Sequence, residues 1–452
     1  MGVPLVLTVA VVSLSRRSVH ADLPADATSI AKLGPAAAAA AAAAPPPPTL
    51  AGLDATKMVV TDDGVHAPLA DKRVAHLTVE PGLQKIASEI LAAHHLPEAA
   101  IVLMDISSGR ILVYASHVEK GPPKDLCLEA TAPAASVFKI ITATALVEHA
   151  NLTPEERTCY SGGEQRIYEK DLEPNPRRDK WCATLAGAMG RSLNTVFARL
   201  ASQHLKPPQL LETAQHLGFG TPLPFDIAPQ ASTITVPDDT LGFARTAAGF
   251  WNTTLSPLHA AWLSATVARG GEPVRPVLVA DVSEEGSSKP MWTAPTGLAQ
   301  KHAMKEATAQ AITTMMESTV SDGTSYRAFH DGKGRAFLPG VSVAGKTGTL
   351  TDASTQRYYT WFTGFAPSKP VTMPDGQKEP PKVAVAVLVV NGPQWSVKAN
   401  VVAREMLRAY FAEEKVPSVT SPTPHAIEHH EDRPPETADR PLHSGVRAAR
   451  AR

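Results

Sequence analysis

Residues 135–141 read Ala-Ser-Val-Phe-Lys-Ile-Ile, so that Ser136 and Lys139 lead directly into an apolar run. We expect a helix to begin at about Ser136, because the apolar residues that follow recur at helical spacing. Positions i and i+3 of a helix share one face, so the Lys139 amine can reach the Ser136 hydroxyl. A neutral lysine can take the serine proton while the oxygen attacks a carbonyl carbon. The free N–H groups of a helix start favour the negative charge that develops on the carbonyl oxygen.

A second polar motif, Ser192-Leu193-Asn194, separates two apolar helical segments. A loop between helices can present a hydroxyl and an amide to a cleft. Ser192 is therefore a candidate proton relay between Lys139 and a leaving amine, and Asn194 a candidate contact for a substrate amide. Taken alone, the tripeptide is more typical of an ordinary serine at the N-cap of a helix.

A third motif, Lys346-Thr347-Gly348-Thr349, lies inside the strand-like run 341–350. A glycine in an edge strand lets an extended substrate approach and add main-chain hydrogen bonds. Lys346 would place a cation beside such a substrate, and the threonine hydroxyls can bind a carboxylate. An ordinary surface strand is the alternative interpretation of this segment.

The surrounding pattern predicts an α+β domain. Strand-like runs at 101–106 and 111–115 flank a turn, and a helical middle section follows. Three more strand-like runs, at 341–350, 358–366 and 383–390, precede a final helix. We expect a five-stranded antiparallel sheet that joins strands from both ends of the region, flanked by helices, with an all-helical lobe.

Composition divides the chain into four parts. Residues 1–21 hold a short apolar run followed by Ser18-Val19-His20-Ala21, which is typical of a signal or membrane-targeting segment. Residues 22–75 contain alanine and proline tracts and are expected to form a low-complexity tether. The catalytic domain is expected over 76–415, and residues 416–452 are expected to be a disordered tail. A second Ser-x-x-Lys pair, Ser29 and Lys32, falls in the tether, where no fold is expected to surround it.

The formal net charge is −1, and no basic run is interleaved with aromatic residues, so nucleic-acid binding is not expected. Three cysteines fit no zinc motif, and neither a metal nor another cofactor is expected. In an exported protein Cys159 and Cys182 could pair, since both flank one polar segment; three unpaired thiols are the alternative.

The three motifs occur once each in the region expected to fold, on a helix start, a loop and a strand. In this combination the sequence resembles the penicillin-binding proteins, the serine transpeptidases that cross-link peptidoglycan. Further stretches that fit the family pattern are Ser108-Gly109-Arg110-Ile111, Leu217-Gly218-Phe219-Gly220, Asp322-Gly323-Thr324 and residues 361–367. The resemblance implies the β-lactamase/transpeptidase fold.

The resemblance also implies catalytic roles. Ser136 matches the acylated nucleophile, Lys139 its general base, Ser192 the proton relay and Lys346 the electrostatic partner. Because two lysines converge, each is expected to disfavour protonation of the other, which leaves Lys139 partly neutral near neutral pH.

Substrate binding is implied for Asn194 and for Thr347, Gly348 and Thr349. Asn194 matches the substrate-amide contact, and the threonines match the carboxylate contacts. The family's oxyanion hole would use the backbone N–H groups of Ser136 and Thr349.

The implied activity is acylation by D-Ala-D-Ala stem peptides and transfer to an amine, with β-lactam antibiotics as further ligands. Transfer to water would make a D,D-carboxypeptidase, and rapid acyl-enzyme hydrolysis a serine β-lactamase. No class A glutamate motif follows Ser192-Leu193-Asn194, and class D enzymes usually have an aliphatic residue at the place of Asn194. A non-catalytic penicillin-binding sensor module is the remaining alternative.

The resemblance is incomplete ahead of the catalytic region. Family members usually carry a glycosyltransferase or a dimerisation module there, and neither fits the tether at 22–75. Glycosyltransferase activity is therefore not expected. We expect an exported protein, in the periplasm or on the outer face of the cytoplasmic membrane, with association with the inner membrane.

Overall fold

The computed structural model describes residues 48–413, except residues 164–165, 251, 296–300, 353 and 373–377. The targeting segment expected at 1–21 and the tail expected at 416–452 lie outside the described residues. Within the described ranges, no helix has both the length and the apolar character of a membrane span.

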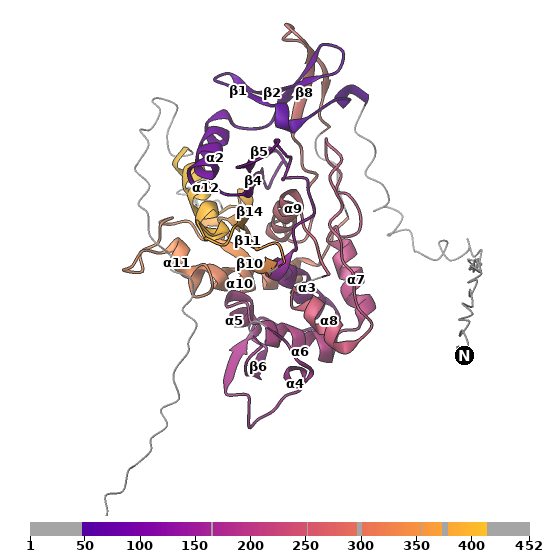
Figure 1. Ribbon diagram of the computed structural model, residues 1–452, viewed down its shortest axis with the longest axis vertical. Helices are drawn as coiled ribbons and strands as arrows, with labels where there is room; N and C mark the ends of the chain where they lie inside the picture. The colour runs from indigo at the N-terminus through magenta and orange to yellow at the C-terminus, as the bar shows by residue number, and fades with distance from the viewer. Residues whose placement is uncertain are drawn as a thin grey trace, which may run out of the picture. The chain divides into compact units, whose positions relative to one another are not determined.

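A central five-stranded antiparallel sheet carries the fold (Figure 1). Its strands, in spatial order, are β10 (Ala344–Asp352), β11 (Arg357–Ala366), β14 (Val383–Asn391), β4 (Glu98–Asp105) and β5 (Ile111–Val118). Two early and three late strands therefore join in one sheet, and the sequence prediction of this sheet is confirmed.

The middle strand β14 contributes to two separate cores. All nine of its residues are buried, which explains its continuous apolar sequence. Ala384 and Ala386 belong to one hydrophobic cluster, while Val383 and Val385 belong to the other. The alternation follows from the strand period of two, which directs neighbouring side chains to opposite faces of the sheet.

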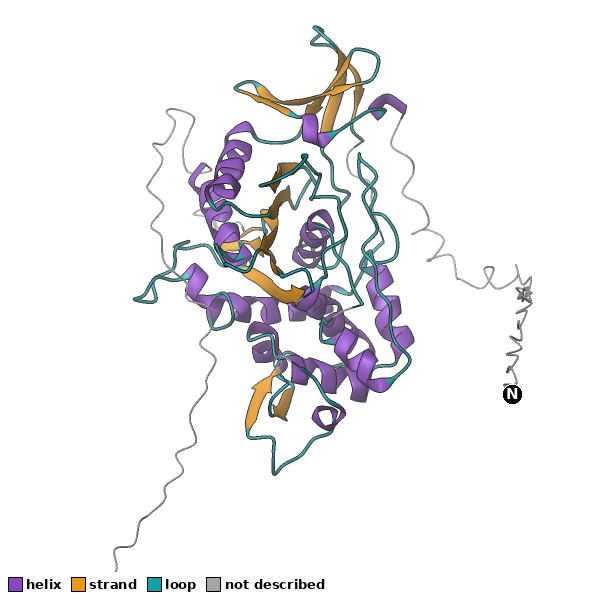
Figure 2. Cartoon of the chain, in the orientation of Figure 1, coloured by secondary structure: helices purple, strands orange, loops and turns teal. Residues whose placement is uncertain are grey.

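Helices cover both faces of the sheet (Figure 2). The buried helix α9 (Pro257–Ala268) packs on one face, and α2 (Pro81–Ala93) and α12 (Ala399–Glu413) pack on the other. Helix α9 begins at an N-cap Ser256, whose hydroxyl accepts the His259 N–H, with Pro257 as its first residue.

A helical lobe adjoins the β10 edge of the sheet (Figure 1). Its elements are the 3-10 turn η4 (Ala135–Phe138), α3 (Lys139–Ala150), α4 (Glu169–Leu172), α5 (Leu185–Gly190), α6 (Asn194–His204), α7 (Pro207–His216), α8 (Thr240–Ala247) and α10 (Glu306–Ser321). The short helix α11 (Tyr326–Phe329) and the two-residue strands β12 (Val371–Thr372) and β13 (Lys378–Glu379) complete the later part of the domain.

A second sheet shows that the expected tether ends earlier than residue 75. Residues 48–75 contain the 3-10 turns η2 (Pro48–Leu50) and η3 (Ala55–Lys57) and much of a five-stranded sheet. That sheet is ordered β1 (Val59–Thr61), β2 (Gly64–Leu69), β3 (Arg73–Leu77), β8 (Val279–Glu284) and β9 (Pro290–Thr293). The tether prediction is wrong for residues 48–75.

The reason lies in the short strands of this segment. Val65 and Ala67 are buried on one side of β2, and a turn with positive φ at Asp71 and Lys72 leads into β3. This alternation spans only the six residues of β2, which is too short to separate the segment from the alanine and proline tracts that precede it at 36–48.

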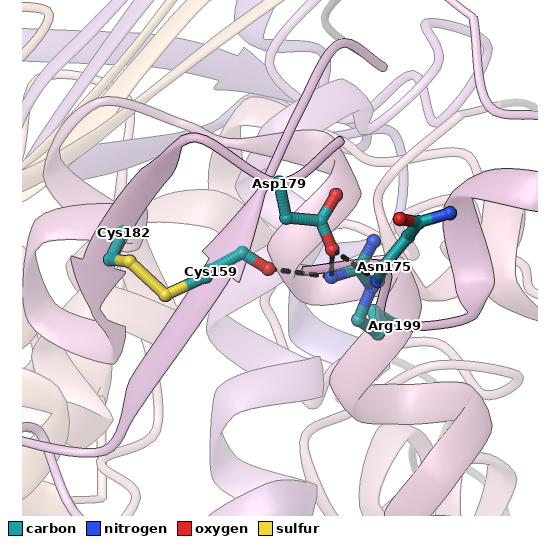
Figure 3. Close-up of a disulfide and its surroundings, with 5 residues drawn as sticks. All are labelled: Cys159, Asn175, Asp179, Cys182 and Arg199. Carbon is teal, nitrogen blue, oxygen red and sulfur yellow. Dashed lines mark hydrogen bonds and ion pairs between the residues drawn. A yellow bond between two sulfur atoms is a disulfide. The ribbon is translucent and has the colours of Figure 1, made fainter. Parts of the chain in front are cut away.

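A two-stranded hairpin projects from the helical lobe. Its strands are β6 (Arg157–Tyr160) and β7 (Trp181–Thr184), and Cys159 lies opposite Cys182 in the register. The two cysteines form a disulfide (Figure 3), which decides between the alternatives that the sequence left open. Cys127 is a free, buried thiol.

Candidate active site

Ser136 and Lys139 meet at the junction of η4 and α3. The first turn is a 3-10 turn rather than the α-helix expected from the sequence, and Lys139 is the first residue of α3. The Lys139 amine lies 2.8 Å from Ser136 Oγ, 2.6 Å from Asn194 Oδ1 and 2.5 Å from the Ala248 carbonyl oxygen. Two of these three partners can only accept a hydrogen bond.

The three oxygens accept the three N–H groups of a protonated Lys139. When the amine is neutral, two N–H donors remain for Asn194 Oδ1 and the Ala248 oxygen, and the lone pair can accept the Ser136 hydroxyl proton. Burial of the side chain lowers the pKa of Lys139 well below its usual value, and the nearby charge of Lys346 lowers it further. The arrangement therefore provides a base beside the serine oxygen.

Ser192 and Lys346 form a second pair. The Lys346 amine donates to Ser192 Oγ at 3.0 Å and to the Thr347 carbonyl oxygen at 2.8 Å. Lys346 is fully buried, and burial lowers its pKa from 10.5 to about 7. A group with this pKa can both hold and release a proton near neutral pH.

The loop between α5 and α6 places Ser192 in an unusual backbone conformation. Ser192 has φ = +58°, in the left-handed region that few residues other than glycine adopt. The N-cap position of α6 is occupied by Leu193, so the interpretation of Ser192 as an ordinary capping serine is wrong. Strained residues of this kind cluster where their side chain has a function.

Strand β10 forms one wall of the site. It is an edge strand, bonded only to β11 in the central sheet. A Cβ on Gly348 would lie 3.2 Å from the Trp361 Cβ and 3.3 Å from the Ala135 Cβ, so the glycine allows β10 to approach the turn that carries Ser136. Thr347 Oγ1 lies 2.6 Å from Thr324 Oγ1, and Thr349 is exposed.

A cavity of about 490 Å³ joins these elements. Six residues predicted from the sequence line it: Ser136, Ser192, Asn194, Thr347, Gly348 and Thr349. Lys139 and Lys346 are bonded to Ser136 and Ser192 from behind this lining. The structure therefore brings together all eight residues that the sequence singled out.

A protein-family model described as "Penicillin binding protein transpeptidase domain" matches residues 99–407, more than half of the chain. The chain belongs to this family. The resemblance inferred from the three motifs is thereby confirmed.

Individual relatives are distant. The peptidoglycan D,D-transpeptidase PbpA of Mycobacterium tuberculosis is 28% identical over 351 residues, which cover 70% of this chain and 67% of PbpA. The chain thus spans about two thirds of the length of this relative.

Solved structures share the fold. The D,D-transpeptidase domain of a peptidoglycan glycosyltransferase from Eggerthella lenta has a TM-score of 0.61 at 21% identity, over 75% of this chain and 83% of that chain. A penicillin G acyl-enzyme complex of penicillin-binding protein A from M. tuberculosis has a TM-score of 0.56 at 24% identity, over 75% of this chain and 80% of that chain.

The cavity of this transpeptidase domain also has a lining that the sequence analysis did not assign to the site: Thr324, Thr360, Trp361, Lys398, Ala399 and Asn400. Thr324 and Trp361 lie in stretches that support the family resemblance, which was the available signal for them. Lys398 directly precedes α12 and Asn400 lies in its first turn. They belong to no local motif, and the path of the chain from β14 to α12 brings them to the site.

Proposed function

We propose that this protein is a peptidoglycan D,D-transpeptidase that is acylated at Ser136 by the D-Ala-D-Ala end of a stem peptide. The hydrogen-bond set of Lys139 is the observation that carries the proposal, since its amine faces one hydroxyl and two pure acceptors. Family membership supports the serine acyltransferase class, and the name of the relative PbpA supports the peptidoglycan substrate.

The first half-reaction forms an ester. Lys139 accepts the hydroxyl proton as Ser136 Oγ bonds to the carbonyl carbon of the penultimate D-Ala, and the N–H groups of Ser136 and Thr349 stabilise the oxyanion. The peptide bond then breaks. The terminal D-Ala leaves as an amine, which receives a proton through Ser192, with Lys346 held on the Ser192 hydroxyl at 3.0 Å.

Substrate binding uses the wall formed by β10. An extended peptide can add main-chain hydrogen bonds to the free edge of this strand. Its terminal carboxylate lies near Thr347 and Thr349, with the Lys346 charge behind them, and Asn194 contacts a substrate amide. In the second half-reaction an amine of another stem peptide attacks the ester, and its proton returns through the same groups.

Penicillin labelling tests this proposal. The intact protein is expected to form a covalent, long-lived adduct with a fluorescent penicillin. Ser136→Ala is expected to abolish the adduct, and Lys139→Ala to slow its formation by about 10²–10⁴-fold, the range for a lost general base. Ser29→Ala removes the serine of the other Ser-x-x-Lys pair and serves as the matched control with full labelling.

The outcome also separates the related activities. Full labelling of the Ser136→Ala protein would refute the proposal. Rapid release of the adduct would instead indicate a β-lactamase. With a stem-peptide substrate, product formed only with water would indicate a D,D-carboxypeptidase, and stable labelling without any peptide turnover would indicate a sensor module.

We further propose that the protein acts outside the cytoplasm, because its peptidoglycan substrate lies there. Residues 1–21 would direct export, and the catalytic domain would reach to about residue 415, followed by the tail at 416–452. Association with the inner membrane is part of this proposal. Separation of periplasmic and membrane fractions tests it, and recovery of the protein in the cytoplasm alone would contradict it.

A further inference from the structure

The hairpin between α3 and α5 is connected at its C-terminal end, through α5, to the active-site loop. We name residues 157–184, of which 164–165 are not described, the disulfide hairpin. Strands β6 and β7 pair across it, and the Cys159–Cys182 bond links them. Its last residue, Thr184, is the N-cap of α5, and α5 ends at Gly190, directly before the loop with Ser192.

The inner side of the disulfide hairpin is bound by a single arginine of α6 (Figure 3). Nη1 of Arg199 donates to the Cys159 carbonyl oxygen at 2.5 Å and to Asp179 Oδ2 at 2.8 Å. Nε and Nη2 of the same side chain donate to the Asp171 carbonyl oxygen at 3.0 and 2.8 Å. One guanidinium thus joins three separate parts of the hairpin to α6.

This contact is buried and charged. The side chains of Arg199 and Asp179 are 1% and 3% exposed. Asp179 also accepts from the Asn175 N–H and the Ser161 hydroxyl, so its position within the hairpin is fixed. A buried pair of this kind provides specific geometry when all of its hydrogen bonds are made, and loss of one partner leaves an uncompensated charge.

A second contact lies nearer to the substrate site. Thr195, the residue after Asn194, donates its hydroxyl to the Gly162 carbonyl oxygen at 2.6 Å. A Cβ on Gly163 would lie 1.7 Å from Thr195 Oγ1, so the backbone of the hairpin packs closely against the first turn of α6. The hairpin therefore contacts the first turn of α6 directly beside Asn194, whose amide oxygen meets the Lys139 amine.

We propose that Arg199 is a positioning residue of this active site. It holds the disulfide hairpin against α6, and the hairpin in turn fixes the loop that carries Ser192 and Asn194. Ser192 and Asn194 are the hydroxyl and amide partners of Lys346 and Lys139, so displacement of the loop would misplace both amines. The inference rests on the proposed acylation of Ser136.

The test compares acylation rate constants of purified full-length variants with fluorescent penicillin. Arg199→Met keeps an unbranched side chain but removes all four hydrogen bonds of the guanidinium. The expected result is an acylation rate constant that is lower by about 10- to 100-fold, the scale of a misplaced catalytic group. The limiting rate is expected to fall more than the affinity.

Arg177→Met is the matched control. Arg177 lies in the same hairpin, but its side chain is exposed rather than buried against α6; Arg178 is unsuitable because it forms an ion pair with Asp179. This variant is expected to acylate at the wild-type rate. The final labelled fraction is measured for every variant, because a purely structural role of Arg199 would lower this fraction and the melting temperature but not the rate constant.

Arg199→Lys decides the question if Arg199→Met does not fold. A lysine keeps the charge beside Asp179, but one amine cannot bind the Cys159 and Asp171 carbonyl oxygens as the guanidinium fork does. Its rate constant is expected to lie between those of the wild type and Arg199→Met. A wild-type rate constant in either Arg199 variant would overturn the inference. Absence of labelling in the wild-type protein would instead refute the proposed function.

Discussion

Replacement of Lys346 by methionine is expected to stabilise the protein while it abolishes acylation. The pKa of Lys346 falls from 10.5 to about 7 because its amine is buried. At about pH 7 this shift corresponds to a cost of roughly 4 kcal/mol for the folded state, at ~1.4 kcal/mol per pKa unit. Methionine would forfeit the hydrogen bonds to Ser192 and Thr347, at about 1 kcal/mol each. The expected net gain for Lys346→Met is therefore about 2 kcal/mol.

The pH dependence of this gain has a definite sign. A lowered pKa means that the folded protein binds fewer protons at Lys346 than the unfolded chain does at pH values between about 7 and 10.5. The destabilising effect of Lys346 therefore becomes smaller, and the free energy of unfolding of the wild type rises, as the pH rises through this window. The cost falls to roughly 2 kcal/mol by about pH 9, so the advantage of Lys346→Met is expected to vanish there.

Urea unfolding, followed by tryptophan fluorescence at the two pH values, measures this difference in the free energy of unfolding. Lys124→Met is the control, and its expected effect on the free energy of unfolding has the opposite sign. The hydrogen bond to Glu98 raises the pKa of Lys124, so loss of this bond is expected to lower stability slightly. The reasoning is refuted if Lys346→Met is no more stable than the wild type at neutral pH, or if its advantage grows with pH.

Two further substitutions test the packing around the serine. Gly348→Ala places a Cβ at 3.2–3.3 Å from the Cβ atoms of Trp361 and Ala135, so the turn with Ser136 must shift. We expect the rate of acylation by fluorescent penicillin to fall by about tenfold or more. An unchanged acylation rate would contradict this account. Trp361→Phe removes the indole N–H that bonds the Pro133 carbonyl oxygen at 2.9 Å. The buried oxygen is left without its donor, so denaturant unfolding is expected to show a loss of about 1–3 kcal/mol, and a loss below the measurement error would count against the importance of this bond.

Much of the fold could be predicted from the sequence because its central elements have strong local patterns. The apolar run of β14 and the Ser256-Pro257 start of α9 each indicate their element without tertiary information. The strands β1 to β3 could not be separated from the tether in the same way. They are short, and they become stable only by pairing with β8, which lies about 200 residues later in the chain.

The residues of the candidate site also differ in whether a local sequence pattern reveals them. Ser136, Lys139 and Lys346 are found because their chemistry depends on a short spacing or a strand motif. Arg199 has no such signal, since an arginine in a helix is ordinarily an exposed residue. Its burial depends on the return of the disulfide hairpin over α6, which only the tertiary structure reveals.

The shared strand β14 has a consequence for how this domain unfolds. Its odd and even residues are the common boundary of the two hydrophobic clusters, one with α9 and the helical lobe and the other with α2 and α12. Loss of the β14 ladders to β11 and β4 would therefore expose both clusters at once. The two layers are therefore expected to exchange their amide protons as one cooperative unit, and the short sheet of β1, β2 and β3 to exchange sooner.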